Sequence, residues 1–192
     1  MAIEQRRARD REAQRRLIVT TARRLAEAQG WDAVTTRRLS EEIEYSQPVL
    51  YKHFSSMDDI AAAVAIDGFD ELTAALAQAR SGADTPELAL RRVAHAYFDF
   101  AQRNPTLYDA MFTRTTTLHF ATTETPQQLS AGFAELRAVV AATADDGDVD
   151  IRTEVLWASL HGLITLARSG RLRPDRDSER LDLLVGEFFA TD

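Results

Sequence analysis

Residues 46–54 read SQPVLYKHF and are dense in hydrogen-bonding side chains for so short a stretch. The segment holds a hydroxyl, an amide, a phenol, an ammonium and an imidazole, but no carboxylate. Val49, Leu50 and Phe54 recur at helical spacing, so a helix here would turn them broadly toward one side. The polar side chains would then face a partner rich in hydrogen-bond acceptors. The residues expected on that other side are Gln47, Pro48, Tyr51 and Lys52.

This polar face has the chemistry of a helix that binds a nucleic-acid duplex. The phenol of Tyr51 and the ammonium of Lys52 suit phosphate oxygens, and the amide of Gln47 can pair with a base edge in the major groove. Pro48 and Val49 can touch a thymine methyl group. A solvated polar helix face would show a similar pattern, and such faces are more common in proteins generally.

The residues before this segment predict the elements that hold it in place. A first helix is expected over residues 10–29, ended by Gly30. TTRRLSEEI, residues 35–43, starts a second helix that Thr35 or Thr36 can cap, and Ser46 caps the third. Two short helices joined by a tight turn make a helix-turn-helix.

The rest of the chain repeats helical periodicity and shows almost no strand pattern. We therefore expect an all-α fold of about nine helices, with an N-terminal three-helix domain over residues 1–56 and a helical domain over residues 57–192. The boundary falls at a long fourth helix that both domains share. The later helices are expected at about 57–79, 86–103, 105–112, 126–144, 149–169 and 178–190.

The charges are distributed unevenly along the chain. The net charge is −7, but residues 1–56 hold eleven basic and eight acidic residues, whereas residues 57–192 hold twelve and twenty-two. A basic end on an acidic body favours a nucleic-acid partner for that end, although chance clustering of solvated arginines would look the same. The chain has no cysteine. It also has no apolar run of membrane-spanning length and no leader-like start, so we expect no membrane partner and a cytoplasmic location.

Residues 34–60, VTTRRLSEEIEYSQPVLYKHFSSMDDI, resemble the DNA-binding region of TetR-type transcriptional regulators. The shared pattern is a helix that opens on Thr, a turn, and a recognition helix with Leu-Tyr-x-His-Phe. The resemblance implies an N-terminal DNA-binding domain and a larger helical domain that binds a ligand and dimerises. It usually also implies repression of genes at a near-palindromic double-stranded operator, relieved by a small molecule.

The same resemblance implies roles for individual residues. Thr36 and Tyr51 would bind phosphate, His53 would lie close to the DNA backbone or pack against the protein, and Lys52 would lie at the duplex edge. Glu44 stands where the turn usually has Gly, so the turn geometry is open to change. Met57 stands where Lys often begins the next helix. The arginines of residues 6–16 either compensate for that missing phosphate contact or form a solvated tail. The DNA-binding candidates are Thr35, Thr36, Arg37, Ser46, Gln47, Pro48, Val49, Tyr51, Lys52 and His53.

The second half resembles a C-terminal class of the same family that is marked by Trp-x-x-x-His-Gly. WASLHGL, residues 157–163, carries that motif, and NPTLYDAMF, residues 104–112, resembles the short helix before its pocket. The resemblance implies an effector pocket without naming the effector. Large side chains with a few polar anchors would line it, although most must simply fill the core. The pocket candidates are Phe69, Tyr97, Phe100, Met111, Phe112, His119, Phe120, Trp157 and His161.

Residues 155–167 and 181–189 are apolar nearly all round a helix, which predicts cover on more than one side. Two such helices from each of two subunits would form a four-helix interface, so we expect a homodimer. The alternative is a terminal helix packed deep in its own domain. The interface candidates are Leu156, Leu160, Leu163, Ile164, Leu181, Leu184, Val185 and Phe188.

No catalytic pattern stands out in the acidic two-thirds of the chain. It has no His-Glu-x-x-His, no glycine-rich phosphate loop and no nucleophile elbow, and its histidines are scattered. We therefore predict no catalytic residue, no metal site and no cofactor. The leading hypothesis is a ligand-responsive DNA-binding repressor that is not an enzyme. The alternatives are a DNA-binding regulator without a small-molecule effector and an enzyme that uses the helical body.

Overall fold

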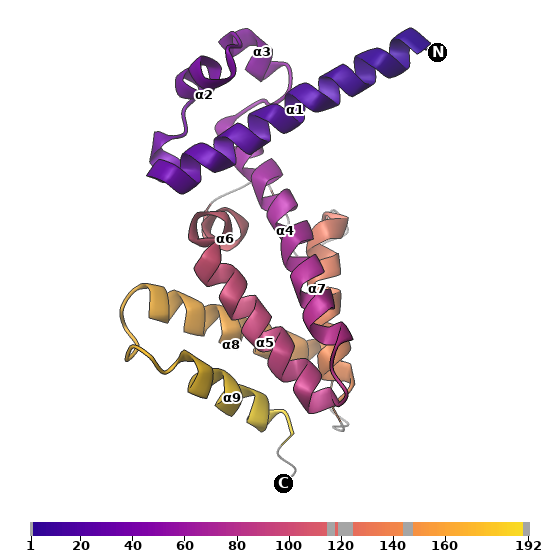
Figure 1. Ribbon diagram of the computed structural model, residues 1–192, viewed down its shortest axis with the longest axis vertical. Helices are drawn as coiled ribbons and strands as arrows, with labels where there is room; N and C mark the ends of the chain where they lie inside the picture. Colours follow the sequence, from indigo (N-terminus) through magenta and orange to yellow (C-terminus); the bar gives the residue numbers. More distant parts are fainter. Residues whose placement is uncertain (1, 115–117, 119–124, 144–147, 190–192) are drawn as a thin grey trace. The chain divides into compact units, whose positions relative to one another are not determined.

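The structure, a computed structural model, describes residues 2–114, 118, 125–143 and 148–189 (Figure 1). Within these ranges the chain forms nine α-helices and one short 3-10 helix, η1, and has no strand, so the all-α prediction is confirmed. The elements are α1 (Ala2–Gln29), η1 (Trp31–Ala33), α2 (Thr36–Ile43), α3 (Gln47–Tyr51), α4 (Met57–Ser81), α5 (Pro86–Arg103), α6 (Pro105–Phe112), α7 (Gln127–Ala141), α8 (Val149–Arg168) and α9 (Asp177–Glu187).

The chain divides into two compact units, and α4 runs from one into the other. The first unit comprises Met1–Gly68 with Asn104–Glu124, and the second comprises Phe69–Arg103 with Thr125–Asp192. The first unit therefore includes α6, which the sequence placed with the C-terminal region. The division into two compact units does not test the predicted boundary between the functional domains at residue 56. That boundary stays a prediction.

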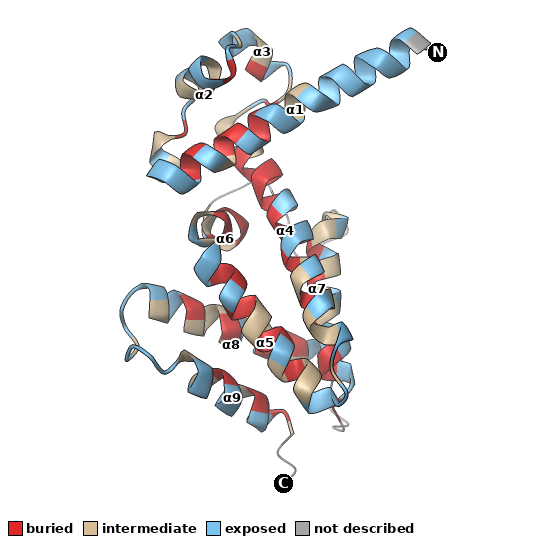
Figure 2. Ribbon diagram, viewed as in Figure 1, coloured by how far each residue is buried: buried red, intermediate tan, exposed pale blue. Residues whose placement is uncertain are grey.

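The core of the first unit forms where α1, α2, α3 and the start of α4 meet. Thr35 caps α2, because its hydroxyl accepts a hydrogen bond from the backbone N–H of Arg38 at 3.2 Å. The apolar residues at helical spacing then turn inward, as the sequence predicts (Figure 2). The buried side chains that join these four helices are Ile18, Leu25, Leu39, Ile43, Leu50, Phe54, Ile60 and Val64.

Helix α6 is held within the first unit by α1, η1 and α4. The indole Nε1 of Trp31 donates a hydrogen bond to the carbonyl of Thr106 at 2.9 Å. Gly68 of α4 permits close approach, because a methyl group there would lie 2.8 Å from Leu107 Cδ1 and from Met111 Sδ. Helix α6 is therefore fixed by both a polar contact and tight packing.

Helix α1 begins at Ala2, eight residues before the predicted start at Asp10. Residues 3–13 are exposed, so packing in the described chain does not explain this extension. Alanine, arginine, glutamine and glutamate have high intrinsic helix propensity. Arg6 and Asp10 add an ion pair of 4.0 Å at a spacing of four residues. The predicted start at Asp10 is wrong because residues 2–9 lack the apolar stripe from which a helix is predicted.

The second unit packs α5 against α7, α8 and α9, with further contacts between α7 and α8. Its core includes Tyr97, Leu136, Leu156, Leu160 and Val185, all nearly inaccessible to solvent. An ion pair of 2.8 Å between Arg80 and Glu135 links α4 to α7 at its rim. This unit is a helical body in which α8 and α9 each bury an apolar face.

The turn between α2 and α3 is made by a residue in a strained conformation. Glu44 has φ 56° and ψ 31°, the left-handed region, and its N–H donates to the carbonyl of Ser40. Glycine adopts this conformation without the steric cost of a Cβ atom. Glu44 thus makes the left-handed cap of α2 at the position where the family pattern has Gly.

Replacing Glu44 by Gly is expected to stabilise the protein. The left-handed conformation costs a residue with a Cβ atom about 1–2 kcal/mol, and the greater freedom of Gly in the unfolded chain offsets part of that cost. We expect Glu44→Gly to raise the free energy of unfolding by roughly 0.5–1 kcal/mol in urea denaturation. Glu44→Ala is the matched control, since it removes the carboxylate but keeps Cβ. An equal gain for both variants would trace the effect to the charge and contradict the strain argument.

Candidate nucleic-acid interface

Helix α3 presents the two faces that its sequence predicts. Leu50 is 1% exposed, and Phe54, just after the helix, is 4% exposed, so both anchor it in the core. Tyr51 is 55% exposed, which is high for an aromatic side chain. Val49 is half-buried, so it lies between the two faces. The candidates on the fully exposed side are Ser46, Gln47, Pro48, Tyr51 and Lys52.

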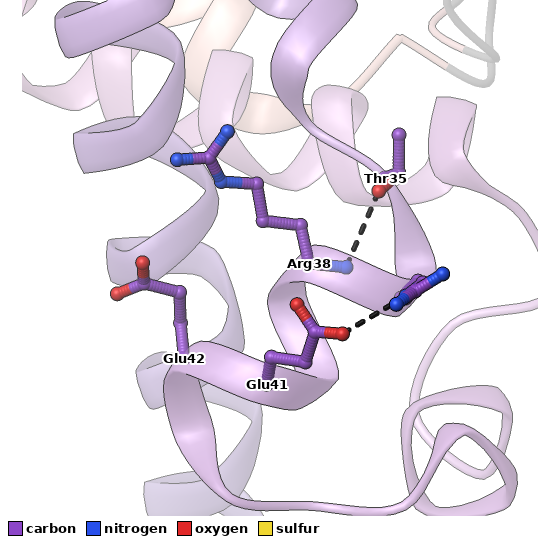
Figure 3. A pocket seen from close by; sticks show the side chains of 5 residues that line it. Thr35, Arg38, Glu41 and Glu42 are labelled. Carbon is purple, nitrogen blue, oxygen red and sulfur yellow. Dashed lines mark hydrogen bonds and ion pairs between the residues drawn. The ribbon is translucent and has the colours of Figure 1, made fainter.

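The start of α2 supplies a second group of candidates beside α3. The hydroxyl of Thr35 caps the helix, Thr36 is half-buried, and Arg37 is exposed. The guanidinium of Arg37 pairs with Glu41 at 2.9 Å, so phosphate binding by Arg37 must compete with this carboxylate. Figure 3 shows a surface hollow here, with the Arg38 side chain extending over it. The hollow is lined by Thr35, Arg37, Arg38, Glu41 and Glu42.

His53 lies where α3 meets α1 and makes contacts with the protein. Its Nε2 is 3.2 Å from Gln14 Oε1, and its carbonyl accepts a hydrogen bond from Arg15 at 3.1 Å. The Arg15 guanidinium also lies over the ring of Phe54, 4.1 Å from the centroid. Burial, and then the positive charges of Arg11, Arg15 and Lys52, lower the pKa of His53. The half-buried imidazole packs the end of α3 against α1, which is one of the two roles left open by the sequence.

Gln14 and Arg15 are contacts that the sequence analysis did not assign. The spacing of Gln14, Arg15 and Ile18 on α1 was the available signal, since residues three and four apart share a helix face. Polar residues on such a face do not reveal their partners without the fold. The candidate surface on α3 is therefore positioned from α1 as well as from its own apolar residues.

The pocket candidates are divided between the two compact units. In the second unit, the indole Nε1 of Trp157 donates a hydrogen bond to the hydroxyl of Tyr97 at 2.9 Å. His161 lies one turn further along α8 and is half-buried, and burial followed by the charge of Arg168 lowers its pKa. The second unit buries Phe69, Tyr97 and Phe100. Helix α6 of the first unit carries Met111 and Phe112. The other two candidates, His119 and Phe120, lie outside the described residues.

Most of the predicted dimer residues are buried within their own chain, where they fill the interior of the second unit. The assignment of these residues to a dimer interface stays a prediction. The buried ones are Leu156, Leu160, Ile164, Leu181, Val185 and Phe188, whereas Leu163 and Leu184 are half-buried. The exposed apolar residues are on the opposite faces, at Ile151, Val155 and Leu166 of α8 and Leu183 of α9. Both faces of α8 carry apolar residues, so the pattern alone did not show which face of that helix turns inward.

Neither a metal-binding cluster nor a membrane-spanning helix is found in the ranges that the structure describes. In those ranges no group of three or more His, Asp or Glu side chains is arranged to hold a metal ion. None of the helices within the same ranges is both long and apolar enough to cross a bilayer.

Two short helices, α2 and α3, joined by a tight turn have the arrangement of a helix-turn-helix. Residues 18–64 match the family model described as bacterial regulatory proteins, tetR family, and residues 90–188 match the tetracyclin repressor-like C-terminal domain. The second match alone spans more than half of the chain. The chain therefore belongs to the TetR family of transcriptional regulators.

Individual proteins similar to this chain cover nearly all of it. The HTH-type transcriptional regulator Rv0681 of Mycobacterium tuberculosis is 29% identical over 180 residues, which are 93% of this chain and 81% of that protein. A solved structure of a Rhodococcus sp. RHA1 protein has 27% identity and a TM-score of 0.73, covering 91% and 93% of the two chains. The structure of RolR with its ligand resorcinol has 20% identity and a TM-score of 0.66, covering 94% and 89%. The last similarity shows the fold alone.

Proposed function

We propose that this protein is a homodimeric repressor that binds a near-palindromic DNA operator and is released by a small apolar or aromatic effector. The observation that carries the proposal is the exposed side of α3, held by the buried Leu50 and Phe54 in a family of DNA-binding regulators. In this proposal residues 1–56 bind DNA, and residues 57–192 bind the effector and dimerise. Nothing in the proposal requires catalysis.

The DNA contacts are assigned by side-chain chemistry and exposure. Gln47 reads a base edge in the major groove, and Pro48 with Val49 touches thymine methyl groups. Phosphate contacts fix the position of the protein without reading sequence. The residues proposed for phosphate and edge contacts are Thr35, Thr36, Arg37, Ser46, Tyr51 and Lys52, with His53 supporting α3 from behind.

Lys52 and Gln47 provide opposite tests of the DNA contacts. Each phosphate contact that is lost flattens the plot of log affinity against log salt by about 0.9. We expect Lys52→Ala to weaken binding to all duplexes alike, with that change in slope for each bound subunit. Gln47→Ala is expected to cost about 1–3 kcal/mol on a duplex selected by the protein and to spare random DNA. Fluorescence anisotropy measures both affinities, and equal losses on both DNAs for Gln47→Ala would overturn its role as a base reader.

A stripe on the outer face of α8 supports the proposed dimer. At 3.6 residues per turn, Ile151, Val155, Gly162 and Leu166 fall on one face, opposite the buried Leu160. A methyl group added at Gly162 would meet no atom within 4 Å, so packing inside the described chain does not require Gly there. Gly in the middle of a helix costs about 1 kcal/mol relative to Ala, but it allows close approach of another helix. The stripe therefore suits a second copy of α8.

Charges placed on this outer face are expected to separate the dimer. Val155 is 54% exposed and Leu183 of α9 is 68% exposed in the single chain, so substitution of either leaves the core intact. Burying an unpaired charge costs at least about 2 kcal/mol, and 1.4 kcal/mol is tenfold in affinity. We expect Val155→Asp with Leu183→Asp to weaken dimerisation on the order of 1,000-fold, as measured by light scattering against concentration. Ile3→Asp is the matched control, and a double variant that stays dimeric would place the interface elsewhere.

The proposed effector site uses the Trp157–Tyr97 pair of the second unit. An apolar wall with a phenol and an imidazole nearby is the usual composition of a small-molecule site, and His161 shares α8 with Trp157. The spacing from Trp157 to Gly162 matches the Trp-x-x-x-His-Gly motif, so we retain the proposal that the second half of the chain belongs to that class. RolR binds resorcinol on a similar fold, which motivates aromatic probes for this chain. A regulator without an effector remains the alternative.

The effector proposal is tested by titrating a panel of aromatic and apolar compounds, starting with resorcinol. A ligand weakens DNA binding only to the extent that it prefers the state with lower DNA affinity. We expect a binder to change the fluorescence of Trp157, raise the melting temperature and lower retention of the selected duplex. Trp157→Phe should abolish the fluorescence change that Trp31→Phe retains. A compound that binds beside Trp157 but leaves DNA affinity unchanged would contradict the coupling, and a panel without binders would favour the alternative.

A further inference from the structure

The first half of α1 is an additional surface of this chain that the family match does not include. The match to the tetR family begins at residue 18, yet α1 begins at Ala2. We call residues 2–17 the α1 arm. Figure 1 shows the N-terminal part of α1 extending beyond α2 and α3 in the same compact unit. At 1.5 Å per residue, the arm is about 24 Å long.

The arm is basic, and most of its charge is not neutralised within the described chain. It holds six arginines against Glu4, Asp10 and Glu12. Arg6 pairs with Asp10 over 4.0 Å, and Arg15 is engaged with His53 and Phe54. The arginines without an ion pair or side-chain hydrogen bond among the described residues are Arg7, Arg9, Arg11 and Arg16.

Helical register places two of these arginines on the side of α3. Arg7, Arg11 and Arg15 are four residues apart, so they share one face of α1. Arg15 identifies that face, because it contacts the carbonyl of His53 at the end of α3. Arg11 and Arg7 lie about 6 and 12 Å further along the helix axis. The lowered pKa of His53, to which Arg11, Arg15 and Lys52 contribute, agrees with a cluster of positive charge at this point.

A helix that is rich in arginine and packs against nothing is stabilised if a polyanion lies along it. Isolated helices of this length are marginal in water, and packing normally supplies most helical stability. Each strand of duplex DNA carries one phosphate for about every 3.4 Å along the helix axis. A span of about 12 Å therefore corresponds to about three or four base pairs.

We infer that the α1 arm binds the phosphate backbone of the DNA that flanks the half-site read by α3, through Arg7 and Arg11. This inference rests on the proposed DNA-binding function. The arm thereby lengthens the DNA footprint and adds affinity that does not depend on base sequence, because phosphates carry no direct sequence information.

The test compares the full-length chain with Arg7→Gln/Arg11→Gln on a duplex selected by the protein from a random library. The duplex is used with about one helical turn of flanking DNA on each side and in a trimmed form without it. Arg171→Gln/Arg173→Gln is the matched control, since it removes two exposed arginines from the second unit. Gln has nearly the helix propensity of Arg, and circular dichroism checks that the arm stays helical.

We expect the arm variant to bind the flanked duplex on the order of tenfold more weakly at low salt and to flatten the salt slope by about 1.8 for each subunit. Trimming the flanks should weaken the wild type and the control but leave the arm variant nearly unchanged. Hydroxyl-radical footprints should lose protection about three or four base pairs beyond the half-site.

Lys52→Ala separates the failure of this inference from the failure of the proposed function. If Lys52→Ala weakens binding while the arm variant matches its control on both duplexes, the arm does not contact DNA and the proposed function stands. If the protein selects no duplex and Lys52→Ala has no effect on random DNA, the proposed function fails and the inference fails with it. An arm effect that persists on the trimmed duplex would overturn the flanking position of the contact.

Discussion

The anchoring of α3 is the constraint on which the DNA-binding surface depends. A helix of five residues has too few internal hydrogen bonds to hold its own conformation in water. Leu50 and Phe54 fix it by burial, and Arg15 covers the ring of Phe54 while bonding to the carbonyl of His53. Every exposed side chain on α3 takes its direction from these contacts. The surface is therefore as much a property of α1 as of α3.

Much of this architecture could be predicted from the sequence, because Pro, Gly and Thr mark many of the helix ends. Ser46 lies at the N-cap position of α3, but its side chain makes no capping hydrogen bond, so that predicted cap is wrong. In the part of the chain that the structure describes, the α-helices lie where periodicity and punctuating residues placed them, apart from shifts at their ends. The outward position of Gln47 and Tyr51 also followed from spacing, since Leu50 and Phe54 had to be inside. These features depend on local rules that operate within one or two helical turns.

The remaining features depend on contacts between distant parts of the chain, which spacing does not encode. Leu160 and Val155 are both apolar residues of α8, but only the packed fold shows that the first is buried and the second exposed. The role of His53 likewise required Gln14, which is 39 residues away. The early start of α1 was missed for a different reason, because intrinsic propensity and charge, rather than an apolar stripe, account for it.

The membership of α6 in the first compact unit constrains how an effector signal would reach DNA. Trp31 bonds to Thr106, and the Arg114 guanidinium lies 5.3 Å from the Trp31 ring centroid and 3.8 Å from Asp58. Together with the close packing at Gly68, these contacts connect α6 and the residues just after it to η1. They also connect α6 to both ends of the part of α4 that lies in the first unit. Tyr97 and Trp157 belong to the second unit, to which α6 is joined covalently through Asn104. Because packed contacts resist continuous deformation, α6, η1 and the start of α4 are expected to move together within the first unit.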